Sequence, residues 1–147
     1  MKKRTLSLLL ALVMIIGLLP VTARAGELDN GLLYEVYEDH VEITGYEGDA
    51  TDVVIPSTIE GRPVTTIVEF AFGNCANLTS ISISESVTFI DNFAFYECNR
   101  LTTIYFTGDA PEIGARAFEC EQAAGVTAIA YYPADNSTWT DEVKQNY

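Results

Sequence analysis

Residues 64–83 read VTTIVEFAFGNCANLTSISI, residues 87–106 read VTFIDNFAFYECNRLTTIYF, and residues 111–120 read PEIGARAFEC. The second segment repeats the first after a step of 23 positions, and the third begins the same pattern again. The positions that keep this step are Ile67, Ile90 and Ile113; Ala71, Ala94 and Ala117; Phe72, Phe95 and Phe118; Cys75 and Cys98; Leu78 and Leu101; Ile81 and Ile104. A fixed period of about 20–29 residues indicates stacked repeats, in which each unit buries its apolar side chains against its neighbours.

Each repeat combines a strand pattern with a turn pattern. Apolar and polar side chains alternate in residues 78–84, and largely so in residues 101–107, which predicts strands with one face in the core. The segment IDNFAFYEC, residues 90–98, is too short for a full helix. We predict that it forms a single helical or 3₁₀ turn, which places an Ala–Phe pair in the core. The repeated phenylalanines should then form one internal column.

Two further segments extend the array. Residues 52–56 match the first strand after a step of 28, with five residues inserted within 57–63, where Gly61-Arg62-Pro63 has the composition of a turn. Residues 126–132 match the second strand after a step of 25, with the insertion near residues 121–125. This second alignment places Ile129 beside Ile104 and Tyr131 beside Phe106. The predicted fold is a mainly β solenoid with short helical turns and a parallel sheet of about four strands.

Both ends of a stacked array need a cap, because the terminal repeats would otherwise expose their apolar sides. Residues 32–37 and 41–46 alternate around a polar turn, which predicts a β-hairpin cap after a polar lead-in at residues 26–31. At the other end, Trp139 should pack over the last coil, followed by a short helical turn. The predicted divisions are a signal peptide (1–25), a capping hairpin (26–52), the repeat array (53–132) and a C-terminal cap or tail (133–147).

The N-terminal residues have the order of a secretory signal. Three basic residues precede an apolar run at residues 8–19, which is followed by Ala23-Arg24-Ala25. We predict cleavage and a secreted or cell-surface protein. The alternative is an uncleaved anchor, although the apolar run is shorter than the roughly 20 residues of a membrane span.

The chain is strongly acidic. It has 8 Lys and Arg against 21 Asp and Glu, a net charge of −13, and loss of residues 1–25 would change this to −17. Such a charge repels phosphate backbones and anionic membranes, so we expect neither nucleic acid nor a membrane surface as a partner.

Three cysteines leave two alternatives open. Cys75 and Cys98 should lie on neighbouring coils, within reach of a disulfide. Equivalent side chains in a stack point the same way, however, so two buried free thiols are favoured over a bridge. Cys120 lies one position before its expected place, where the repeat breaks down.

Few residues suggest catalysis. His40 is the only histidine, and it falls in the predicted hairpin turn, where we expect a solvated side chain. One histidine and no Cys-x-x-Cys pair cannot support an ordinary zinc site. We therefore predict no catalytic residue, cofactor or metal. A small secreted hydrolase that uses paired carboxylates such as Glu38-Asp39 is the weakest alternative.

The outward side chains of the predicted sheet form two lanes across the strands. One lane is Val54, Ser82, Tyr105 and Ala130, and the other is Asp52, Ser80, Thr103 and Ala128. Interface energy concentrates in Trp, Tyr and Arg, so Tyr105 is the best single contact candidate. Asp52, Val54, Ser80, Ser82 and Thr103 complete the predicted protein-binding face, and for these five a solvated sheet face is the stronger alternative.

The recurring pattern x-F-A-F-x-x-C-x-x-L-T-x-I-x-(I/F) resembles the BspA-type (Treponema-like) leucine-rich repeats of bacterial surface and secreted proteins, over residues 32–140. The resemblance implies a parallel-strand solenoid that binds extracellular host or microbial proteins and does not catalyse a reaction. Two readings follow. The chain is either an adhesion-type interaction module or a structural cap-and-repeat part of a larger surface protein.

Overall fold

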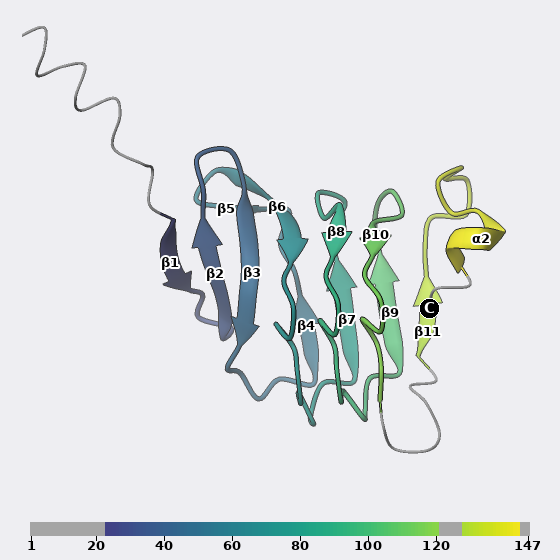
Figure 1. Ribbon diagram of the computed structural model, residues 1–147, viewed down its shortest axis with the longest axis horizontal. Helices are drawn as coiled ribbons and strands as arrows, with labels where there is room; N and C mark the ends of the chain where they lie inside the picture. The colour runs from purple at the N-terminus through teal and green to yellow at the C-terminus, as the bar shows by residue number, and fades with distance from the viewer. Residues whose placement is uncertain (1–22, 121–127, 145–147) are drawn as a thin grey trace, which may run out of the picture.

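The computed structural model describes residues 23–120 and 128–144, and nearly all regular structure in these ranges is β. The coils follow one another along a single axis, from the N-terminal hairpin to a short C-terminal helix (Figure 1). This arrangement confirms the predicted mainly β solenoid. Most of the predicted signal peptide, the predicted insertion near residues 121–125 and the last three residues of the tail lie outside the described residues.

The predicted four-stranded parallel sheet is present. Its strands are β4 (Asp52–Val54), β7 (Ser80–Ile83), β9 (Thr103–Phe106) and β11 (Ile129–Tyr131), in the spatial order β11-β9-β7-β4. Asp52 pairs with Ser80 and Val54 with Ser82, which confirms the step of 28 predicted for the first strand. The strands alternate as predicted, because Ile81, Ile83, Ile104 and Phe106 are buried and their neighbours face outward.

The predicted alignment of the last strand is wrong by one residue. Ala130 pairs with Ile104 and Tyr131 with Tyr105, so the step is 26 rather than 25. Because side chains in a strand alternate between faces, a shift of one residue exchanges the inner and outer sets. The ring of Trp139 lies 4.8 Å from that of Phe106 and fills the core at this end. A small inward alanine and an outward tyrosine fit this arrangement.

A second parallel sheet, which was not predicted, joins the coils on their other side. It contains β6 (Arg62–Ile67), β8 (Phe89–Ile90) and β10 (Glu112–Ile113), and Ile67, Ile90 and Ile113 pair in register. The strands β8 and β10 have two residues each, too few to show an alternating pattern in the sequence.

The segments after these strands are chains of tight turns, so the predicted helical or 3₁₀ turn is wrong. Phe70, Phe93 and Arg116 have φ values of 57°, 55° and 59°, in the left-handed region that interrupts a helix. Because of this, alternate amides point along the stack. The N–H of Phe72 donates to the carbonyl oxygen of Ala94 on the next coil at 2.8 Å. A helix would satisfy these amides within one coil and leave the coils without this ladder.

The core is the internal aromatic column that the repeat predicted. The rings of Phe72 and Phe95 stack at 5.0 Å between centroids, and those of Phe95 and Phe118 also stack at 5.0 Å. Tyr46 of the N-terminal cap stacks on Phe72 at 5.6 Å and closes the column. The repeated alanines Ala71, Ala94 and Ala117 are buried beside it.

The N-terminal cap is the predicted hairpin of β2 (Leu32–Val36) and β3 (Val41–Tyr46), and β3 continues the second sheet by pairing in parallel with β6. The lead-in differs from the prediction, because β1 (Arg24–Glu27) pairs with β2 as an edge strand. The insertion within residues 57–63 is also more ordered than a simple turn. It forms β5 (Thr58–Ile59), which pairs with the start of β6 around Glu60 and Gly61.

The C-terminal cap agrees with the prediction. Trp139 is buried, and its indole N–H donates to the carbonyl oxygen of Gly108 at 3.0 Å. The predicted short helical turn is α2 (Asp141–Lys144).

Cys75, Cys98 and Cys120 are free thiols, so Cys75 and Cys98 do not form a disulfide, as favoured above. Cys98 is fully buried and its thiol donates to the carbonyl oxygen of Phe72, whereas Cys75 is only half-buried. The hydrogen-bonded contact with Cys75, together with burial, raises the pKa of the Cys98 thiol.

Candidate protein-interaction face

The outward side chains of β4, β7, β9 and β11 form one continuous surface, which we call the sheet face. Its registered lanes are Val54, Ser82, Tyr105 and Tyr131, and Asp52, Ser80, Thr103 and Ile129. The structure brings together all six residues that the sequence predicted for this face. The expected lane ends Ala130 and Ala128 are wrong, and Tyr131 and Ile129 take their places because of the one-residue shift in β11.

Two tyrosines dominate the sheet face at its C-terminal end. The rings of Tyr105 and Tyr131 stack with 5.1 Å between centroids and an interplanar angle of 21°, and we call them the tyrosine pair. Tyr105 is 43% exposed, Tyr131 is 50% exposed and the adjacent Ile129 is 60% exposed. Stacking orders the two rings before any partner binds, which lowers the entropy lost on association. The result is a rigid, exposed apolar surface with hydroxyl groups at its edge.

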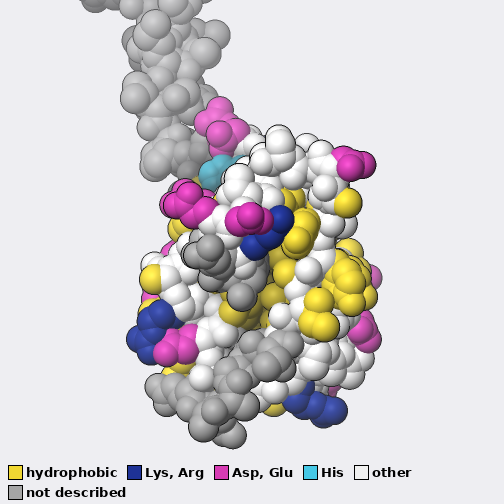
Figure 2. Space-filling view, turned by 90° about the vertical axis from the view of Figure 1, so that its right-hand side faces the viewer, with side chains coloured by type: hydrophobic (Ala, Val, Ile, Leu, Met, Phe, Trp, Pro, Cys, Tyr) yellow, Lys and Arg dark blue, Asp and Glu magenta, His cyan; other side chains and the backbone are white. Residues whose placement is uncertain are grey.

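Exposed apolar side chains also gather at the C-terminal end of the array (Figure 2). Figure 2 faces this end and shows hydrophobic side chains gathered over its centre and toward the right of the view, with acidic and basic side chains beside them. Large exposed apolar areas are uncommon on monomeric proteins and mark interaction surfaces.

The opposite end of the sheet face, on β4, carries a negative charge beside the exposed Val54. The carboxylate of Asp52 accepts hydrogen bonds from the hydroxyl groups of Ser80 and Thr51. These hydrogen bonds, that from Ser80 first, lower the pKa of Asp52, so its negative charge is fixed. The sheet face therefore changes from an anionic, hydroxyl-rich end on β4 to an aromatic end on β11.

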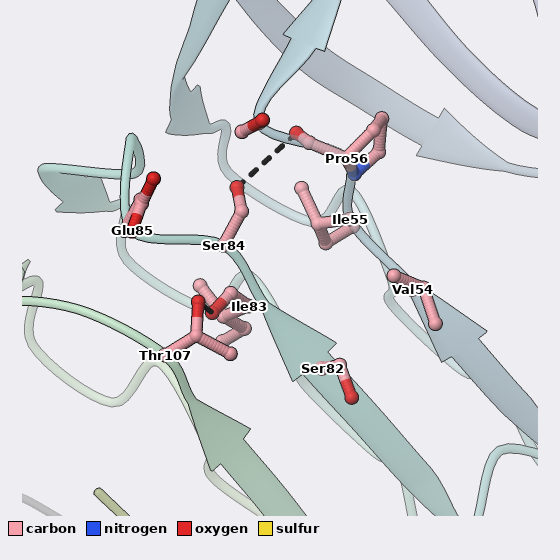
Figure 3. A pocket seen from close by; sticks show the side chains of 9 residues that line it. Val54, Ile55, Pro56, Ser82, Ile83, Ser84, Glu85 and Thr107 are labelled. Carbon is pink, nitrogen blue, oxygen red and sulfur yellow. Dashed lines mark hydrogen bonds between the residues drawn. The ribbon is translucent and has the colours of Figure 1, made fainter. Parts of the chain in front are cut away.

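A pocket of about 340 Å³ lies beside the sheet face, at the carboxyl ends of β4, β7 and β9. Val54 and Glu85 stand on opposite sides of it, with Ile83 and Ser84 between them (Figure 3). This pocket was not predicted, because its residues come from three coils and no sequence motif joins them.

His40 is placed away from this pocket, at the end of the cap hairpin. It is not the freely solvated residue expected from the sequence, because its Nδ1 lies 2.7 Å from the Asp39 carboxylate and its ring stacks on Tyr37 at 4.7 Å. The hydrogen bond with Asp39 raises the pKa of His40. These contacts hold the histidine as part of the cap.

Two further features, a metal-binding cluster and a membrane-spanning helix, are absent from the residues that the structure describes. Within residues 23–120 and 128–144, no three His, Cys, Asp or Glu side chains are grouped so that they could hold a metal ion. The same ranges contain no helix that is long and apolar enough to cross a membrane.

The sequence allows two alignments of the last strand with β9, and only one of them places Tyr131 beside Tyr105. A step of 25 aligns apolar residues with apolar residues, whereas a step of 26 aligns Tyr131 with Tyr105. Matching identical residues does not select the observed register either, because a step of 25 also aligns Ile129 with Ile104.

Comparison with known proteins agrees with this geometry. Residues 46–130, more than half of the chain, match the family model described as "BspA type Leucine rich repeat region (6 copies)". No match was found among curated proteins.

Among solved structures, a leucine rich cell surface protein from Faecalibacterium prausnitzii A2-165 has a TM-score of 0.57 and 28% identity, covering 67% of this chain and 28% of that protein. The Treponema pallidum leucine-rich repeat protein has a TM-score of 0.55 and 23% identity, covering 73% and 64% of the two chains. A leucine-rich repeat protein from Bacteroides capillosus ATCC 29799 has a TM-score of 0.52 and 22% identity, covering 74% and 98%.

The last two likenesses, which are below 25% identity, support the fold alone. This chain spans less than two thirds of the length of the first two proteins. The resemblance in the repeated F-A-F and Leu-Thr positions is confirmed by the family match. The chain belongs to the family of BspA-type leucine-rich repeat proteins.

Proposed function

We propose that this chain is a non-catalytic protein-interaction module of a secreted or cell-surface bacterial protein, and that it binds extracellular proteins through its sheet face. The observation that carries the proposal is the tyrosine pair, which is stacked, exposed and bordered by Ile129. Tyrosine side chains are enriched among the residues that dominate binding energy at protein interfaces.

The proposed location draws on two further observations. The N-terminal sequence has the order of a secretory signal. The relative from Faecalibacterium prausnitzii is described as a leucine rich cell surface protein.

The size of the sheet face favours weak or multivalent binding. A standard interface buries about 800 Å² on each partner. Four strands of three or four residues, spaced about 4.8 Å apart, cover only about 200–250 Å², well below this area. Several weak contacts in one assembly can still give strong overall attachment, because each bound contact raises the effective concentration of the next.

A capture experiment tests the proposal. The immobilised chain is exposed to solubilised host matrix proteins and to bacterial surface proteins, and bound proteins are identified by mass spectrometry. We expect the double variant Tyr105→Ala, Tyr131→Ala to bind its captured partner at least tenfold more weakly, because residues of this kind contribute about 2 kcal/mol or more.

The matched control is Phe70→Ala. Phe70 is also an exposed aromatic residue, 51% exposed and stacked on Phe93, but it lies in a turn segment outside the sheet face. Unchanged capture by the double tyrosine variant, or equal loss in the Phe70 variant, would refute the sheet face as the binding surface.

A further inference from the structure

The pocket beside the sheet face has apolar walls and a polar rim. Its accessible apolar surface comes from Val54 and Pro56, and the side chains of Ile55 and Ile83 lie beneath it, buried in the core. The polar residues Ser57, Ser82, Ser84, Glu85 and Thr107 complete the lining. A pocket of about 340 Å³ with this lining suits a long side chain that has an apolar stem and a polar end.

The hydroxyl groups on the rim are arranged to accept hydrogen bonds. The Ser84 hydroxyl donates to the carbonyl oxygen of Pro56 at 3.1 Å (Figure 3), and the Thr107 hydroxyl donates to that of Ile83 at 3.4 Å. A hydroxyl has one proton and two lone pairs, so a group that has donated its proton offers only acceptor capacity. At Ser84 one lone pair then accepts from the Ser86 hydroxyl at 3.1 Å, and the other is left for a ligand. The pocket therefore suits a ligand group that donates several hydrogen bonds.

The one charged group at the pocket is a carboxylate. Within residues 23–120 and 128–144, the Glu85 carboxylate has no hydrogen-bond or ion-pair partner, and no Lys or Arg lines the pocket. The basic residues of the described chain are elsewhere, and Arg24, Arg116 and Lys144 are already paired with Glu60, Glu119 and Asp141. An anionic ligand would be repelled here, and a single carboxylate is too few for a metal ion.

We propose that this pocket receives a lysine or arginine side chain of the partner protein, whose neighbouring residues lie on the tyrosine pair. The inference rests on the proposed function and names the kind of partner: a basic segment that also carries an aromatic or apolar side chain. The methylene stem would lie against Val54 and Pro56, and the cationic end would meet Glu85 and the two hydroxyl groups.

The register of the sheet connects the two contact points. Ser82, which lines the pocket, pairs directly with Tyr105 of the tyrosine pair. The pocket spans the ends of β4, β7 and β9 and is centred near β7, and the tyrosine pair lies over β9 and β11, so their centres are about one and a half strand spacings, roughly 7.2 Å, apart. In an extended segment, side chains on one face recur every two residues, about 6.6 Å. The basic and aromatic residues of the partner should therefore be two positions apart.

Two synthetic heptapeptides test the inference by NMR titration of the isotope-labelled chain. The first has lysine at its centre, tyrosine two positions to each side and threonine elsewhere, and the second has norleucine in place of lysine. We expect the lysine peptide to shift the amide resonances of Ser84 and Thr107 and to bind about fivefold more tightly than the norleucine peptide. This is the upper range for an exposed ion pair. Binding of both peptides with equal affinity, or no shift at Ser84 and Thr107, would overturn the inference.

Three variants separate this inference from the proposed function. Glu85→Gln, which keeps the shape of the side chain, should weaken binding of the lysine peptide about fivefold and leave the norleucine peptide unchanged. Glu112→Gln, on the exposed surface of the second sheet, is the matched control and should change neither. If Tyr105→Ala with Tyr131→Ala abolishes capture of the protein partner while Glu85→Gln changes nothing, the proposed function stands and the pocket assignment is wrong. If Glu85→Gln alone weakens binding, the pocket assignment stands and the tyrosine pair is not the binding surface.

Discussion

Truncation of the central phenylalanine of the internal column, Phe95→Ala, should destabilise the chain strongly. Phe95 is fully buried, and its ring stacks at 5.0 Å on both Phe72 and Phe118. Loss of its burial costs about 1.5–3 kcal/mol. Each 100 Å³ of cavity that does not collapse adds about 2.4 kcal/mol. With partial collapse, we expect a loss of about 3–5 kcal/mol in the free energy of unfolding. This is a large part of the roughly 5–15 kcal/mol that stabilises a typical domain.

Urea denaturation followed by circular dichroism measures this loss. Phe70→Ala is the control, because it removes the same side chain from an exposed position on the preceding repeat, 51% exposed and outside the column. Its ring contacts with Phe93 and Tyr96 are worth about 1 kcal/mol. If the two variants lose the same stability, the phenylalanine column does not hold the coils together and the stacking argument is wrong.

Three further predictions concern the pH response, the thiols and one turn. The His40 pKa lies above its ordinary value of 6.5 because of the hydrogen bond with Asp39. The stabilisation from this pair is therefore present below about pH 6.5 and is lost as the pH rises through the raised pKa. In Asp39→Asn, the midpoint of an NMR titration of His40 should move toward 6.5, and an unchanged midpoint would contradict the contact. Thiol labelling of the native chain should modify the half-buried Cys75 but spare the fully buried Cys98 until the chain unfolds, so rapid labelling of Cys98 would be inconsistent with the packed column. Gly61→Ala should lower the free energy of unfolding in urea by about 1 kcal/mol, because Gly61 has φ = +77°. The space around Gly61 is open, so the cost comes from the backbone conformation, and an unchanged stability would mean that this turn is not left-handed.

The features of the fold that could be predicted are those in which each repeat must pack an equivalent side chain against the next repeat. The 23-residue step defines the column of Phe72, Phe95 and Phe118, because each phenylalanine must meet its equivalent on the next coil. The second sheet and the turn geometry depend on backbone hydrogen bonds between coils, which any residue can make. The left-handed conformation at Phe70 and Phe93 leaves no trace in the sequence, since glycine, the usual residue there, is absent.

The candidate site depends on features that are harder to read from sequence. The sheet face could be outlined in advance, because alternation fixes which side chains point outward. Tyr131 was missed because a shift of one residue in a short strand exchanges its inward and outward side chains. The pocket beside Glu85 could not be found, since it depends on the relative positions of three coils.

The register of β11 against β9 creates the tyrosine pair, and nuclear Overhauser contacts measure it directly. The rings of Tyr105 and Tyr131, with centroids 5.1 Å apart, should show strong ring-to-ring contacts in the folded chain. Contacts from the Tyr105 ring to the methyl group of Ala130, with none to Tyr131, would show the alternative register and remove the proposed binding surface.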